Sequence, residues 1–174
     1  MRYKAVTLLL LAVVIAAFAP PSEGKRPDFC QLVVMLDEPQ LSGENIGEEW
    51  VVDLFLRYNG DVDVVNIVDY VQSECECDWF FVIPSFPAVV FNTYIKNGDE
   101  FELVVVAREE DEGRDDEGRA STTLTASCAE ATTYAAHRVS FPLEIQETLG
   151  PEAGRVAKWD FELRVALLPP RPEP

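Results

Sequence analysis

Two cysteines separated by one residue are the most chemically suggestive feature of this sequence. Cys75 and Cys77 lie in residues 72–80 (QSECECDWF), and the chain holds two further cysteines, Cys30 and Cys128. In an extended strand, residues i and i+2 project on the same side with their Cβ atoms about 6 to 7 Å apart. A disulfide requires Cβ atoms about 3.8 Å apart, so this pair can bond internally only across a sharp turn. We therefore expect each to bond to a cysteine on a facing element, and Cys30 and Cys128 are the only candidates.

Structural disulfides are the favoured interpretation, because cysteines of exported proteins are usually oxidised. A bridge from Cys75 or Cys77 to Cys128 would close a loop of about 50 residues and stabilise the fold by roughly 4 kcal/mol. Adjacent thiolates could instead hold a soft ion such as copper or zinc, with Cys30, Cys128 or His137 as further ligands. They could also form a reversible dithiol, although the acidic neighbours in the same stretch disfavour the thiolate. The alternative function is therefore thiol-redox or metal-handling chemistry centred on this pair.

Residues 108–119 (REEDEGRDDEGR) contain seven carboxylates and three arginines and are predicted to form a loop. Hard cations such as calcium take several oxygen ligands from a flexible loop. The candidate ligands are Glu109, Glu110, Asp111, Asp115, Asp116 and Glu117. Their spacing does not fit the EF-hand pattern, and a charge run of this kind is usually solvated. We therefore assign no metal ligand and expect no cofactor.

The sequence offers little for catalysis. His137 is the only histidine, no serine stands in a G-x-S-x-G context, and no glycine-rich loop could cradle a phosphate. A hydrolase triad therefore has little support, and His137 is predicted to be a half-exposed strand residue. We expect a protein that is not an enzyme.

Residues 1–24 have the layout of a secretory signal. Arg2 and Lys4 precede an apolar run over residues 6–19, and the small and polar residues PPSEGK follow. The run is too short to span a bilayer comfortably, although an uncleaved signal anchor is the alternative. We expect a secreted protein of the periplasm or cell envelope.

Removal of this segment takes away Arg2, Lys4 and Glu23, which leaves 12 basic and 30 acidic side chains, a net charge of about −18. Nucleic acids and anionic membranes would repel such a chain. We therefore expect no nucleic acid, no membrane contact beyond the signal segment, and a protein partner, which is either basic or bound by strand addition.

Alternation of apolar and polar residues dominates the middle of the chain and predicts strands. Residues 50–58 (WVVDLFLRY) place Trp50 and every second residue on one face. Asn59-Gly60 follows, and such a pair between two alternating runs is a strong hairpin signal because both residues tolerate positive φ. Residues 61–72 form the returning strand of this predicted hairpin.

Seven further strands are predicted, over residues 31–36, 79–83, 88–95, 100–107, 120–128, 137–145 and 155–168. In the last strand the inward residues are Trp159, Phe161, Leu163, Val165 and Leu167. With no convincing amphipathic helix, a second sheet must cover each apolar face. We predict one all-β domain over residues 28–168, an immunoglobulin-like antiparallel β-sandwich, and an extended proline-rich tail over residues 169–174.

Residues 47–128 resemble an exported bacterial family of unknown function. The resemblance lies in VVDLFLRYNGDVDVVNIVDYVQSECECDW and in YIKNGDEFELVVVARE. Members of that family show a strand, an Asn-Gly or Asn-x-Gly turn, a returning strand and a Ser-Cys-Gly-Cys motif. The family is similar to the Hydin-type and major-sperm-protein-type immunoglobulin-like domains. The resemblance implies a non-enzymatic interaction or structural module.

This sequence departs from the family pattern at two positions, where Glu76 replaces glycine and Asp78 replaces threonine. Cys30 and Cys128 lie at or beyond the edges of the matched region, which favours a disulfide role here. A weaker resemblance is to the lumenal domains of the translocon-associated complex, which are also sandwiches with an Asn-x-Gly turn. Those domains carry a C-terminal membrane anchor, whereas this chain ends in LLPPRPEP.

Overall fold

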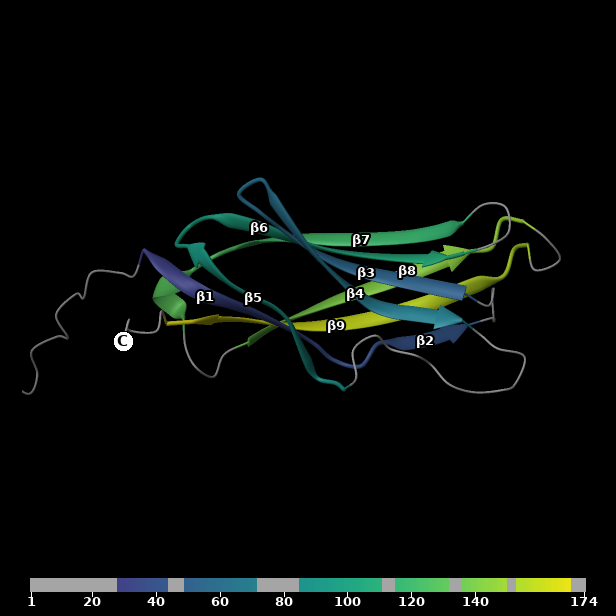
Figure 1. Cartoon of the computed structure of the whole chain (residues 1–174), viewed down its shortest axis with the longest axis horizontal. Coiled ribbons are helices and arrows are strands. Elements are labelled where there is room, and N and C mark those ends of the chain that lie inside the picture. The colour runs from purple at the N-terminus through teal and green to yellow at the C-terminus, as the bar shows by residue number, and fades with distance from the viewer. Residues whose placement is uncertain are drawn as a thin grey trace, which may run out of the picture.

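The computed structural model describes residues 28–43, 49–71, 85–110, 115–131, 136–149 and 153–169. Within these ranges it contains nine strands and one short 3₁₀ helix, whose order is shown in Figure 1. The elements are β1 (Phe29–Leu36), β2 (Gln40–Gly43), β3 (Glu49–Tyr58), β4 (Asp61–Val71), β5 (Ala88–Lys96), β6 (Glu100–Glu109), β7 (Asp116–Thr125), η1 (Cys128–Glu130), β8 (Ala136–Gln146) and β9 (Val156–Leu168).

The strands form two antiparallel sheets that lie over one another along the long axis of the molecule (Figure 1). In the first, sheet A, β9 pairs with β8 on one side and with β2 and then β1 on the other, and β5 lies outside β1. The second, sheet B, has the order β4-β3-β6-β7. The predicted all-β antiparallel sandwich is therefore confirmed.

The core lies between the two sheets and follows the alternation along the strands. On β3 the inward side chains Trp50, Val52, Leu54 and Leu56 are buried, as predicted. On β9 the buried series Trp159, Phe161, Leu163 and Val165 faces them. The indole rings of Trp50 and Trp159 meet edge to face with their centroids 5.7 Å apart, a favourable arrangement for aromatic rings.

The predicted hairpin at Asn59-Gly60 is present between β3 and β4. Asn59 has φ 53° and Gly60 has φ 88°, the positive values that a tight two-residue turn requires. Tyr58 pairs with Asp61 directly across the turn. A β-bulge at Ile67 interrupts the register further along β4, because Val52 pairs with Val68 and Asp53 pairs with Asn66.

The structure differs from the predicted strands in three places. Residues 40–43 form the short strand β2, which was not predicted because Ser42 and Gly43 are poor strand formers. The predicted loop 108–119 is wrong at both ends, since β6 continues to Glu109 and β7 begins at Asp116. Cys128 lies in η1, not at the end of a strand. The predicted strand 79–83 lies outside the described residues.

At one end of the sandwich the edge strands β7 and β8 approach closely. Gly118 of β7 is buried, and a Cβ atom at this position would lie 2.5 Å from Cγ1 of Ile145 on β8. Real Cβ atoms do not approach so closely, so only glycine allows this spacing. The absence of a side chain at Gly118 therefore allows β7 and β8 to pack closely at this end of the sandwich.

Candidate functional site

The first predicted site is the cysteine set, and the structure pairs it differently from expectation. Cys30 of β1 and Cys128 of η1 form a disulfide with their Cα atoms 5.4 Å apart and 98 positions apart in the chain. The expectation that these two would bond to Cys75 and Cys77 is therefore wrong, because β1 and η1 bring them to each other. Cys75 and Cys77 lie outside the described residues. With the other two cysteines joined, each has only the other as a cysteine partner within the chain.

The residues around the disulfide hold the two sheets together. The backbone N–H of Cys128 donates a hydrogen bond to Oδ1 of Asn97 at 2.8 Å, in the turn between β5 and β6. In the same turn, Gly98 N–H donates to the carbonyl of Ala126 at 2.8 Å. Because β5 belongs to sheet A and β6 to sheet B, this turn and the disulfide together tie the two sheets at one end.

Three buried carboxylates meet at the opposite end, where β7 and β8 lie close. Glu109 ends β6, Asp116 begins β7, and Glu147 follows β8. Glu109 and Asp116 are register partners, and carboxylate oxygens of all three residues lie within 4.8 Å of one another. We call this group the carboxylate cluster. Glu109 is 0% exposed.

Hydrogen bonds tie the carboxylate cluster to the turn between β8 and β9. The Thr148 backbone N–H donates to Oδ2 of Asp116 at 2.9 Å, and the Thr148 hydroxyl donates to Oδ1 at 2.7 Å. Leu149 N–H donates to Oε1 of Glu147 at 3.0 Å. Asp116 therefore joins the edge of sheet B to the end of sheet A. Carboxylate oxygens are also the ligands that hard divalent cations prefer, so these three residues are, among those that the structure describes, a group that could hold one.

The structure brings only some of the six candidate calcium ligands of the acidic stretch close to one another. Only Glu109 and Asp116 come together, whereas Glu110, Asp115 and Glu117 are exposed and Asp111 lies outside the described residues. Glu147 was missed. A signal for it exists, because the inward residues Phe141, Leu143 and Ile145 alternate along β8, and one more step along the same face reaches Glu147.

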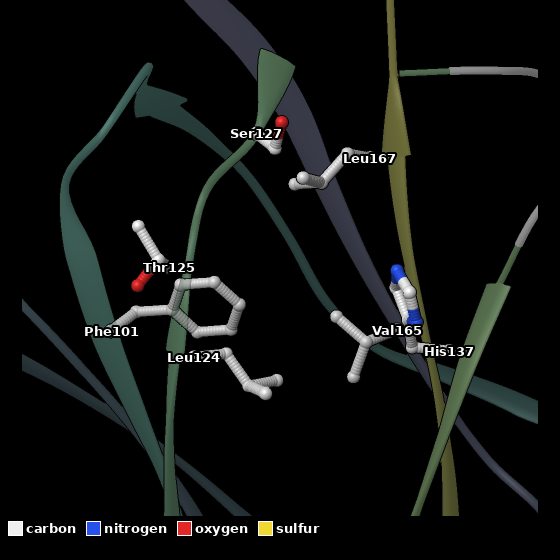
Figure 2. Close-up of a pocket in the computed structure, with 7 residues that line it drawn as sticks. All are labelled: Phe101, Leu124, Thr125, Ser127, His137, Val165 and Leu167. Atoms are coloured by element: carbon white, nitrogen blue, oxygen red, sulfur yellow. The ribbon is translucent and has the colours of Figure 1, made fainter. Parts of the chain in front are cut away.

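A pocket of about 260 Å³ opens between the sheets near the disulfide end. Figure 2 shows Phe101 and Leu124 of sheet B facing Val165 and His137 of sheet A across it. Leu167, Thr125 and Ser127 complete the described lining. The pocket lies where the end of β7 and the start of β8 diverge, away from the close contact at Gly118.

His137 is exposed at the start of β8, where it pairs in register with Val165. It lies beside the pocket together with two hydroxyl side chains, those of Thr125 and Ser127. A nucleophile-histidine pair also requires an acid that orients the imidazole. None of the described lining residues is a carboxylate. The described pocket is therefore mainly an apolar recess.

The outer face of sheet B carries exposed apolar side chains. Val62 and Val64 on β4 are each 56% exposed and are register partners of Arg57 and Phe55 on β3. Next to Phe55 on the same face, Val104 of β6 is fully buried beneath its neighbours. Val64 thus extends an apolar row formed with Phe55 and Val104, whereas Val62 lies beside the ion pair of Arg57 and Glu102.

Ion pairs lie on the outer faces of both sheets. Arg57 pairs with Glu102 and Arg108 with Asp53 on sheet B, each at 3.2 Å. On sheet A, Glu144 accepts a hydrogen bond from Lys158 at 2.6 Å and raises the pKa of the Lys158 ammonium group. The exposed Arg57–Glu102 and Lys158–Glu144 pairs contribute little to stability, and they mark a solvated surface.

No family model matches this sequence, and comparison with curated proteins finds no similar chain. In the part of the chain that the structure describes, no helix is long and apolar enough to cross a membrane.

Proposed function

We propose that this chain is an exported, non-enzymatic immunoglobulin-like domain that acts as a protein-interaction or structural module of the periplasm or cell envelope. The observation that carries the proposal is the set of apolar side chains that remain more than half exposed on the strands. They are Phe29, Val62, Val64, Val89 and Tyr94. Val62 and Val64 lie together on one face of β4 in sheet B, whereas the other three lie on β1 and β5 of sheet A. Exposed apolar groups that lie together on a sheet suit contact with another macromolecule.

One structural observation and one sequence feature support export. The Cys30–Cys128 bond would persist in an oxidising compartment and would be reduced in most cytosols. Residues 1–24 have the layout of a secretory signal. The expected resemblance of residues 47–128 to an exported bacterial family agrees with export but remains a prediction from the sequence.

Cell fractionation of a bacterial host that expresses the full chain tests this proposal. We expect the protein outside the cytoplasm, with Cys30 and Cys128 oxidised. Photo-crosslinkers at Val62, Val89 or Tyr94 should join it to another envelope protein in intact cells. Retention in the cytoplasm with both cysteines reduced would refute the proposal.

A second candidate function is thiol-redox or metal-handling chemistry at Cys75 and Cys77. It is favoured by the Cys30–Cys128 bond, which leaves these two cysteines without any other cysteine partner. Alkylation under denaturing conditions, with and without reductant, followed by mass spectrometry distinguishes the candidates. Two free thiols at Cys75 and Cys77 would support this function, whereas none would support a structural bond. Metal analysis of the purified protein then separates redox from metal chemistry.

A further inference from the structure

Five of the described strands lie at sheet edges, and four of them carry features that discourage a basic partner strand. β8 contains Pro142 and Arg138, β7 contains Arg119, and β5 ends in Lys96 and has no carboxylate. β2 is only 4 residues long. Short length, proline and cations are common means of protecting an edge. Among these strands, β4 combines carboxylates with the absence of lysine, arginine and proline.

The first part of β4 is exposed to solvent. Asp61, Val62, Asp63 and Val64 are all exposed, although their strand is paired to β3 along its other side. The register with β3 places Val62 and Val64 on the outer face of sheet B, and Asp61 and Asp63 on the opposite face. This edge therefore offers two valines on one side and two carboxylates on the other.

The two aspartates decide which kind of strand could pair here. In an antiparallel pair of two identical chains, carboxylates of one β4 would lie beside carboxylates of the other, which is unfavourable. Inward-pointing charges on an edge strand are a known protection against such self-pairing. A strand that places lysine or arginine opposite Asp61 and Asp63 would gain favourable cross-strand pairs instead. The net charge of −17 would also accelerate the approach of a basic partner.

We infer that the edge of β4 away from β3, which pairs with no other described strand, binds an extended segment of another protein in which basic and apolar residues alternate. The segment adds a strand to sheet B next to residues 61–66, with its basic side chains beside Asp61 and Asp63 and its apolar side chains beside Val62 and Val64. The bulge at Ile67 ends the regular edge, so the paired segment is short. This inference rests on the proposed function, since it names the partner class of the interaction module.

A synthetic peptide of Lys-Val repeats, labelled with a fluorophore, serves as the probe. We expect it to bind the folded full chain, and we expect the amides of residues 61–66 to exchange more slowly with solvent in its presence. A peptide of Glu-Val repeats should not bind. A third peptide has the composition of the first with all its lysines grouped at one end. It should bind at least about tenfold more weakly, because it cannot match the alternation of the strand.

Charge reversal and a matched control locate the site. The double variant Asp61→Lys/Asp63→Lys should exchange the preference, binding the Glu-Val peptide and not the Lys-Val peptide. Val64→Lys should weaken Lys-Val binding at least about tenfold. Val89→Lys on β5 makes the same change of charge at a side chain that is 60% exposed, and it should have little effect.

The inference would be overturned if the grouped-lysine peptide bound as tightly as the Lys-Val peptide. It would also be overturned if Val89→Lys and Val64→Lys weakened Lys-Val binding equally, because either result would show a general attraction to an acidic surface. Self-association abolished by Val64→Lys would overturn it in favour of a second copy. Hydrogen exchange on the unchanged protein keeps the test valid if a variant fails to fold. If the chain is exported but cross-links only through other strands, this inference fails and the proposed function stands. Retention in the cytoplasm would instead refute the proposed function, whatever the peptides show.

Discussion

Tyr58 shows how one side chain can join several segments of this sandwich. Its hydroxyl donates a hydrogen bond to Oδ2 of Asp99 and accepts one from the backbone N–H of Lys96, both at 3.0 Å. Tyr58 ends β3 in sheet B, whereas Lys96 ends β5 in sheet A. The phenol therefore links the sheets close to the turn that also holds Cys128.

Tyr58→Phe should lower the free energy of unfolding by about 1 to 2 kcal/mol, because it removes both hydrogen bonds and leaves the partly buried carboxylate of Asp99 and the amide of Lys96 to find other partners. Chemical denaturation measures this loss. Tyr94→Phe is the matched control, because Tyr94 is 54% exposed on β5, and it should change stability by less than about 0.5 kcal/mol. Equal losses from the two variants would contradict this role for Tyr58.

Strands β7 and β8 lie close together where Gly118 of β7 faces the side chain of Ile145 of β8. We expect Gly118→Ala to cost about 1 to 3 kcal/mol, because the new methyl group would overlap Cγ1 of Ile145 in a filled core. Ile145→Ala should cost about 2 to 5 kcal/mol through the cavity that it leaves.

The double variant provides the check on that contact. Alanine at position 145 lacks the Cγ1 atom that the new methyl group would meet, so the combined loss should be smaller than the sum of the two single losses. Thermal and denaturant unfolding of all four proteins gives the coupling energy. Purely additive losses would mean that the new methyl group does not press on Ile145.

Strands β3, β7 and β9 show which features of the fold can be predicted from the sequence and which cannot. The hairpin at Asn59-Gly60 and the inward series of β3 and β9 follow from alternation and turn chemistry, both of which are local properties. β7 was misplaced because its inward residues begin with Asp116 and Gly118, which look like loop residues. Their burial depends on Thr148 and Ile145, more than 25 positions away along the chain. The Cys30–Cys128 pairing was missed for the same reason, since it follows from the placement of whole strands.

For the molecule as a whole, the Cys30–Cys128 bond encloses most of the described chain. In the chain-entropy model, a loop of this size stabilises the fold by about 4 to 5 kcal/mol. The variant Cys30→Ala/Cys128→Ala should lose about that amount in a denaturant titration. The unchanged protein should also lose stability in the presence of a reductant, which breaks this bond. If neither the double substitution nor the reductant shifts the unfolding curve, this bond does not stabilise the fold.

The position of β9 in sheet A also bears on the order in which the protein assembles. β9 pairs with β1, β2 and β8, yet ribosomes make it after every other described strand. All strands of sheet B end by Thr125, so a nascent chain can complete that layer first. The Trp50 and leucine side chains on the inner face of sheet B would then be exposed to water, or bound by a chaperone, until β9 emerges and covers them.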